Sequence, residues 1–244
     1  MARKKRHIAY AIRCAAVAAS IAFTLGAMVP KICVNYRINN HRRIVMALPK
    51  YFEAIENHLD KYFNENDEIM VIDEIESPDF HLDIYWIKPN KNRNYTLLLS
   101  NGISSMPFET PDKSLSKYIE LCILLPPDWD MENDNWKKSN NYWPIGLIKS
   151  LGRYPSENNT WLGYGHTIPR TEPMTGTNFM ATILLKSITL SDDFQKIKYG
   201  KKTIEVYLLF PLFSEELEYK KINGTDKLLE LLEKEKLGIH MTQV

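Results

Sequence analysis

Hydrophobic and polar residues alternate with two different periods along the chain after residue 40. From His41 to Phe63, apolar residues recur every three or four positions, which indicates an amphipathic helix, and Pro49 marks its expected start. Later apolar runs of five to eight residues, each bounded by Pro, Asn, Asp or Gly, predict β-strands. The six predicted strands are Ile69–Ile75, Leu82–Ile87, Tyr95–Leu99, Tyr118–Leu125, Phe179–Lys186 and Thr203–Phe210.

A second helix is predicted within the stretch Trp143–Pro169. Its apolar residues recur at helical spacing: Ile145, Ile148 and Leu151. Pro144 suits the first helical turn, where its missing N–H needs no partner, and Pro155 is expected to end the helix. The segment Ser156–Ile168 that follows has neither strand nor helix period, yet it holds two aromatic residues, two glycines and His166. This segment is therefore the first place to expect a functional site.

The carboxyl-terminal region is predicted to contain further helices. With these, the order of elements allows the fold class to be assigned. Ser214 can cap a short helical turn, and Thr225 can cap a last helix that ends at Gly238. The continuously apolar strand Thr203–Phe210 is expected to be central in its sheet. The order of helix, four strands, helix, two strands and two helices predicts an α+β (mixed α/β) fold. We expect a single compact domain with a central sheet of about six strands, mostly antiparallel or mixed, and helices packed on it.

The first 40 residues differ from the rest of the chain. Basic residues at Arg3–Arg6 precede an alanine-rich apolar run, Cys14–Val29, which Pro30 closes. A run of 16 residues is shorter than the roughly 20 that a bilayer requires and slightly longer than the apolar region of a signal peptide. Three interpretations stay open, namely an uncleaved membrane anchor, a cleaved signal and a dispensable helical extension. The composition changes near residue 40, so we divide the chain into residues 1–40 and a domain of residues 41–244.

Charge and cysteine content narrow the classes of partner. The chain has 31 basic and 30 acidic residues and a formal net charge of +1, which gives no reason to expect a nucleic-acid partner. Of the three cysteines, only Cys122 lies in the predicted domain, so no disulfide framework can form there. We therefore expect the domain in the cytoplasm, with membrane association through residues 1–40 as a further prediction.

The sequence carries no recognisable catalytic or metal-binding motif. Ser104 and Ser105 follow Gly102 but lack the flanking glycines of a nucleophile elbow. Gly163 and Gly165 lie between aromatic residues and are not followed by the Lys and Ser or Thr of a phosphate-binding loop. No HExxH or paired-cysteine spacing is found. We therefore predict no catalytic residue, no metal and no cofactor.

We predict that three loops contact a partner: Gly102–Ser116, Asp128–Asn141 and Ser156–Ile168. Trp and Tyr are enriched at protein interfaces, although each of these side chains could instead belong to the core. For His166, a structural hydrogen-bonding role, a partner-binding role and an acid–base role all stay open. The predicted partner-binding residues are Trp129, Trp161, Tyr164, His166, Asp83 and Glu157.

Four segments of the chain resemble the suppressor-of-fused domain family, in the same order and at similar spacing. They read HLDIYWIKP, YTLLLSNGIS, IELCILLPPDW and WPIGLIKSLGRYPSENNTWLGYGHTIP, and the resemblance covers roughly Pro49 to Phe213. The resemblance implies a compact α/β domain. In the animal regulators of this family a second lobe helps to clamp an extended peptide of a transcription factor, and we expect this chain to lack that lobe.

Single-domain relatives of this kind are usually bacterial, and the resemblance implies that they act as immunity proteins, each of which binds and neutralises a cognate toxin. Our first hypothesis is therefore a non-catalytic protein-binding domain whose partner is a toxin encoded nearby. A second hypothesis is a hydrolase or transferase centred on His166, with Asp83, Glu157 or Asp128 as its carboxylate. A third is a membrane-tethered protein of the cell envelope.

Overall fold

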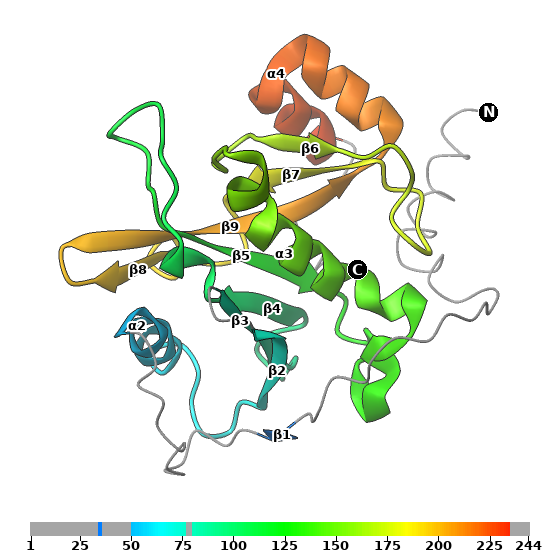
Figure 1. The fold of residues 1–244 in the computed structure, drawn as a ribbon. Coiled ribbons are helices and arrows are strands. Elements are labelled where there is room, and N and C mark those ends of the chain that lie inside the picture. Colours follow the sequence, from blue (N-terminus) through cyan, green and yellow to red (C-terminus); the bar gives the residue numbers. More distant parts are fainter. Residues whose placement is uncertain (1–33, 36–49, 77–79, 235–244) are drawn as a thin grey trace.

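A twisted β-sheet with helices on both faces forms the centre of the molecule (Figure 1). The computed structural model describes residues 34–35, 50–76 and 80–234. The helices are α2 (Lys50–Leu59), α3 (Ser139–Asn158) and α4 (Ser214–Lys234), with two 3₁₀ helices, η1 (Ile103–Ser105) and η2 (Glu132–Lys137). The strands are β1 (Val34–Asn35), β2 (Ile69–Glu76), β3 (His81–Ile87), β4 (Thr96–Asn101), β5 (Ile119–Leu125), β6 (Thr167–Pro169), β7 (Ala181–Leu185), β8 (Lys196–Tyr199) and β9 (Lys202–Leu212).

The sheet is mixed, as its sequence pattern predicted. Its strand order in the described part of the chain is β1-β2-β3-β4-β5-β9-β7-β6, and β8 pairs with β9 outside this path. Strands β2 to β5 form antiparallel neighbours, whereas β5 and β9 are parallel and are joined by a long crossover that contains α3. Strand β9 pairs with β5, β7 and β8, which confirms its predicted central position.

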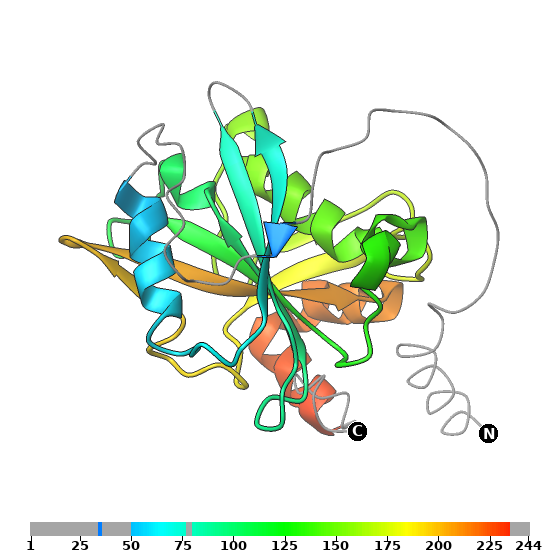
Figure 2. The same ribbon diagram turned by 90° about the horizontal axis from the view of Figure 1, so that it is seen from below.

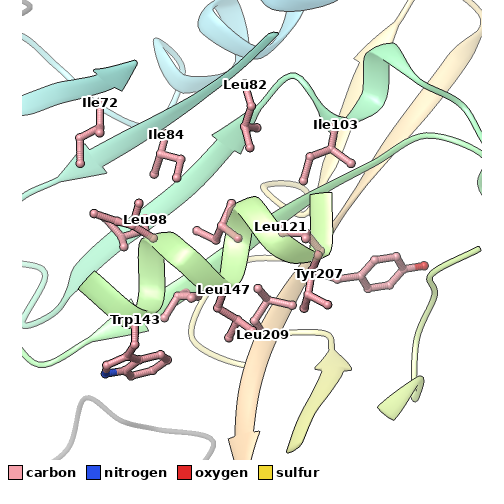
Figure 3. Packing of buried hydrophobic residues seen from close by; sticks show 14 of the residues in the cluster. Ile72, Leu82, Ile84, Leu98, Ile103, Leu121, Trp143, Leu147, Tyr207 and Leu209 are labelled. Atoms are coloured by element: carbon pink, nitrogen blue, oxygen red, sulfur yellow. The ribbon is translucent and has the colours of Figure 1, made fainter. Parts of the chain in front are cut away.

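Helix α3 covers one face of the sheet (Figure 3). Alternate residues of the strands point toward it, because successive side chains in a strand point to opposite faces. The helix contributes Ile145, Ile148 and Leu151 to this core, as the helical spacing predicted. The strand residues that meet them include Leu82, Ile84, Trp86, Leu98, Leu121, Ile123, Leu184 and Leu209.

The other face of the sheet is covered by α2 and α4. Residues Ile55 and Leu59 of α2 pack on strand residues of opposite parity, such as Tyr85 and Leu99. Leu228 and Leu232 of α4 pack on the outer part of the same face, against β7 and β9. Figure 2 shows α3 and α4 on opposite sides of the sheet. The molecule is thus a three-layer α/β/α arrangement.

The six predicted strands are confirmed, and the sheet is larger than predicted. The additional strands β1, β6 and β8 have two to four residues each, which is too short for a hydrophobic period to show. These segments are strands because they pair with neighbouring strands, and not because of a pattern in their own sequences.

Helix α3 is longer than the pattern indicated, at both ends. It begins at Ser139 because Tyr142 stacks on Trp136, and Asn141 hydrogen-bonds the main chain of Asp130 and Asn135. It also runs through Pro155 to Asn158, which corrects the expectation that Pro155 ends it. A proline removes one helical hydrogen bond, and here the buried face of the helix, together with the bond from the Thr160 N–H to the Pro155 carbonyl, stabilises the last turn.

Helix α4 contains both carboxyl-terminal helices that the sequence predicted. It bends at Gly224, which has a φ of 83°, so Ser214 begins the first half and Thr225 follows the bend. None of the helices in the described part of the chain combines the length and apolar composition that a membrane span requires. Residues 1–33 and 235–244, with the predicted N-terminal apolar run and the helix end at Gly238, lie outside the described residues.

Candidate functional site

Residues Gly163 to His166, here called the GYGH loop, form a turn that is fixed to the edge of the sheet. The N–H of His166 donates to the Gly163 carbonyl at 3.1 Å. The N–H of Gly165 donates to the carbonyl of Leu184 in β7 at 2.7 Å, and the N–H of Leu184 donates back to the His166 carbonyl at 2.9 Å. Main-chain hydrogen bonds therefore continue the pairing of β6 and β7 into the loop.

The His166 ring contacts Trp161, which the sequence also predicted as a site residue. Their ring centroids lie 4.1 Å apart in an edge-on arrangement. Burial lowers the pKa of His166, a hydrogen bond to the main chain of Trp161 raises it, and the nearby charge of Lys220 lowers it; the net pKa is below the usual value. The lowered pKa favours the neutral form of the imidazole.

Tyr164 is the exposed member of the GYGH loop, with 48% of its surface accessible. The loop adjoins the bend of α4, because a Cβ atom added to Gly165 would lie 2.9 Å from the Oγ1 of Thr225. Asp226 is close enough to help raise the pKa of Tyr164, although burial is the larger cause. Ile222, just before the bend, is 81% exposed. The loop and the bend together present aromatic and aliphatic side chains to solvent.

Trp129 and Glu157 lie at the two ends of α3. Trp129 precedes the helix and packs edge-on against Trp143, with ring centroids 5.9 Å apart. Glu157 lies in the last turn, where its Oε1 is 3.6 Å from the Nε of Arg153 and both side chains are largely exposed. The rest of α3 therefore separates Trp129 from Glu157.

Asp83 is the one predicted site residue that is fully buried. Its Oδ1 lies 2.9 Å from the Nε2 of His81, and the His81 ring is 5.2 Å from the ring of Phe52 in α2. Asp83 thus belongs to the sheet face that α2 covers. The structure brings Trp161, Tyr164 and His166 together and places Trp129, Glu157 and Asp83 in three other positions.

A pocket of about 280 Å³ lies between the carboxyl-terminal half of α3 and the connection between β4 and β5. Residues 102–118 make this connection, here called the β4–β5 loop. Two of the three loops predicted from sequence therefore meet at one pocket. The residues that line it are Ile103, Met106, Pro107, Phe108 and Glu109 on one side and Gly152, Pro155, Ser156, Asn159 and Thr160 on the other.

Sequence reasoning missed Glu120, a fully buried carboxylate in β5. It accepts hydrogen bonds from the hydroxyl groups of Ser100 and Ser104 and from the N–H groups of Gly102 and Ser104. Burial raises its pKa, and these donors act in the opposite direction. A single acidic residue in the apolar strand IELCILL was the signal that could have indicated it, since buried acids are rare unless they have partners.

Within the described residues, no group of three or more His, Cys, Asp and Glu side chains has the arrangement needed to hold a metal ion. Of the three acids that could have assisted His166, Asp83 is engaged with His81 and Glu157 with Arg153, while Asp128 is exposed and lies next to Trp129, before α3. The GYGH loop and its neighbours form a surface that presents aromatic rings and hydrogen-bonding groups.

The family model described as Suppressor of fused protein (SUFU) matches residues 78–244. This chain belongs to the suppressor-of-fused family. The matched residues include β3 to β9, the GYGH loop and the β4–β5 loop, which carry the motifs singled out in the sequence. The recognition made from those motifs is confirmed. A search of curated proteins found no match to this chain.

Solved structures of SUFU proteins share the fold. A SUFU homolog from Neisseria gonorrhoeae FA 1090 is 12% identical, with a TM-score of 0.58, over 80% of this chain and 95% of that chain. The Sufu-Fu complex gives 17% identity and a TM-score of 0.53, over 75% of this chain and 83% of the other. Drosophila Suppressor of Fused is also 17% identical to this chain, with a TM-score of 0.53. The match covers 84% of this chain and 49% of the Drosophila chain. At these identities the similarity establishes the fold alone.

Proposed function

We propose that this chain is a non-catalytic protein-binding domain, and that it acts as a bacterial immunity protein which neutralises a toxin encoded nearby. Membership of the SUFU family carries this proposal, because one solved structure with this fold is a complex of Sufu with Fu. The resemblance to single-domain bacterial relatives supports the toxin as the class of partner, and a SUFU homolog with this fold is found in Neisseria gonorrhoeae.

The proposed contact surface lies around the carboxyl-terminal end of α3. It combines the pocket beside the β4–β5 loop with the GYGH loop and the adjoining bend of α4. Both loops are fixed to the sheet by hydrogen bonds, so little conformational entropy is lost when a partner binds. Exposed Tyr164 and Ile222 would supply the apolar contacts that dominate binding energy at protein interfaces. Trp129 and the segment Asp128–Lys138, which folds into η2 and not into the loop predicted from the sequence, lie at the other end of α3 and would extend the surface.

The proposal of a hydrolase or transferase centred on His166 has less support. A general base needs a second group that orients it and a substrate proton within hydrogen-bond reach. The His166 ring packs edge-on against Trp161, and Asp83 pairs with His81 on the face that α2 covers. No arrangement of described residues around His166 favours this second function over protein binding.

Co-expression with the product of the neighbouring toxin gene tests the proposed function. We expect the two proteins to co-purify and the host cell to grow. Replacement of the exposed isoleucine beside the GYGH loop, Ile222→Ser, should weaken the complex by about 10-fold. Ile188→Ser is the matched control, because Ile188 is also an exposed isoleucine but lies in the connection between β7 and β8. If the wild-type chain gave neither a complex nor protection, the proposed function would be wrong.

Membrane association through residues 1–40 stays a prediction, because only residues 34–35 of this segment are described. We propose a cytoplasmic domain that this segment can tether to the membrane. A fusion of residues 1–40 to a soluble reporter protein tests it by cell fractionation. Recovery of the whole reporter in the soluble fraction would rule out the membrane anchor.

A further inference from the structure

All four hydrogen bonds that the Glu120 carboxylate accepts come from one short segment, Ser100 to Ser104. Its Oε1 accepts from the N–H of Gly102 at 3.1 Å, the N–H of Ser104 at 2.9 Å and the Ser104 hydroxyl at 2.7 Å. Its Oε2 accepts from the Ser100 hydroxyl at 2.5 Å. Glu120 is in β5, so these bonds fix the end of β4 and η1 to the neighbouring strand.

A buried carboxylate is energetically unfavourable at a strand position that faces the protein interior. Removing a carboxylate from water is unfavourable unless hydrogen bonds compensate, and an apolar residue would avoid that desolvation. The carboxylate gives something that an apolar residue lacks, because it accepts hydrogen bonds from main-chain N–H groups in a turn. Without it, the N–H groups of Gly102 and Ser104 would be buried without an acceptor.

A further hydrogen bond lies within the turn itself. The Ser105 hydroxyl donates to the Gly102 carbonyl at 2.5 Å. This bond closes the turn on itself, whereas the bonds to Glu120 fix the turn to β5.

The residues of this turn and those just after it form one wall of the pocket beside α3. Ile103 lies within η1 and Met106 directly follows it, and both line the pocket. The opposite wall approaches closely, because a Cβ atom added to Gly152 of α3 would lie 3.1 Å from Ile103. A shift of the turn would therefore change the width of the pocket.

We propose that Glu120 is a positioning residue, whose carboxylate sets the shape of the β4–β5 loop and thereby presets the pocket for the partner. The effect on the loop is independent of the partner, whereas the effect on binding rests on the proposed function. The acceptor geometry at Oε1, not the charge, is what fixes the loop.

Amide hydrogen exchange of the full-length chain tests the effect on the loop. In Glu120→Ala, the N–H groups of Gly102 and Ser104 should exchange about 10-fold faster or more, because each loses its acceptor. In Glu120→Gln, the amide oxygen can still accept both bonds, so exchange at these sites should change about 3-fold at most. Leu124→Ala is the control, since it removes a buried apolar side chain from the same strand without touching the loop.

Equal acceleration in Leu124→Ala and Glu120→Ala would overturn the proposal, because it would mean that both act only through global stability. If Glu120→Ala does not fold, Glu120→Leu gives the same test, since it also removes the acceptor of both N–H groups and keeps an apolar side chain of similar size in the buried strand. Faster exchange at Gly102 than in the Leu124→Ala control would then support the proposal, and exchange equal to the control would overturn it.

The affinity for the toxin encoded by the neighbouring gene tests the second part of the proposal, namely that Glu120 presets the pocket for the partner. We expect Glu120→Ala to weaken the complex by about 10-fold, and Glu120→Gln to restore most of the affinity. Unchanged affinity together with faster loop exchange would overturn the presetting of the pocket and leave the proposed function intact. Failure of the wild-type chain to bind the toxin would overturn both binding proposals, and the exchange experiment would still decide whether Glu120 positions the loop.

Discussion

The β4–β5 loop and the GYGH loop flank the same end of α3 but are held in different ways. At its start, the β4–β5 loop depends on one side chain, the buried carboxylate of Glu120, which accepts the hydrogen bonds of the Gly102 and Ser104 N–H groups and of the Ser104 hydroxyl. The GYGH loop depends on main-chain bonds between Gly165, His166 and Leu184. A substitution can remove the first kind of anchor but not the second. The β4–β5 loop is therefore the one whose shape a single side chain controls.

The two loops also differ in what surrounds their glycines. Gly102 has a φ of 146° and lies against main chain, whereas Gly165 has a φ of 76° and lies against the side chain of Thr225. Main chain in a paired strand cannot move away, but a side chain can. Alanine substitutions at the two glycines should therefore lower the free energy of unfolding by different amounts.

Gly102→Ala should have the largest effect. The new Cβ atom would lie 2.1 Å from the His81 carbonyl oxygen in β3, and the backbone conformation is unfavourable for alanine. We expect a loss of about 3 kcal/mol or more in the free energy of unfolding, measured by urea denaturation. The control is Gly200→Ala, which has a φ of 58° and no atom within 4 Å, and should cost about 1–2 kcal/mol. Equal losses would show that the contact with β3 is not decisive.

Gly165→Ala should cost less, about 1–3 kcal/mol, because the Thr225 side chain can yield. The second substitution Thr225→Ala removes the Oγ1 atom that the new Cβ would approach at 2.9 Å. The double variant should therefore recover about 1 kcal/mol relative to the sum of the single variants. Additive losses would indicate that backbone strain, not the contact with α4, determines the cost.

The pH dependence of stability should report on His166. Because burial is the main cause that lowers its pKa below 6.5, the folded state binds the proton less readily than the unfolded state. The stability that this histidine contributes is present above pH 6.5 and is lost as the pH falls through the folded pKa. His166→Gln should therefore show a smaller loss of stability than the wild type between pH 7 and pH 5, measured by thermal unfolding. His58, whose pKa is also lowered by burial, stays in both proteins and cancels in the comparison.

Tyr164→Ala should have the smallest effect on stability, within about 0.5 kcal/mol, because about half of the residue is exposed to solvent. Its effect on toxin binding should be larger, a loss of about 10-fold in affinity by calorimetry. Tyr62→Ala serves as the control, since Tyr62 is a partly exposed tyrosine next to α2. If both variants bound the toxin like the wild type, the GYGH loop would not belong to the contact surface.

The candidate site could be predicted from the sequence only in part. The aromatic residues and His166 of one loop could be proposed as site residues because an irregular segment rich in glycine and aromatic residues is visible in a linear sequence. Asp83 was placed beside His166 as one alternative, but the sheet buries it under α2, where it pairs with His81. Glu120 was missed because its four donors are 16 to 20 residues away in the chain and meet it only through strand pairing.

The sequence by itself determined the six longer strands, the amphipathic faces of the helices and membership of the SUFU family. These features depend on local period and on short motifs, which the chain carries whatever its tertiary structure. The tertiary structure alone decided the additional short strands, the continuation of α3 through Pro155, and the meeting of the β4–β5 loop with the end of α3. The physical reason is that hydrogen bonds between distant strands and packing between layers override local preference, and neither can be read along a single line of residues.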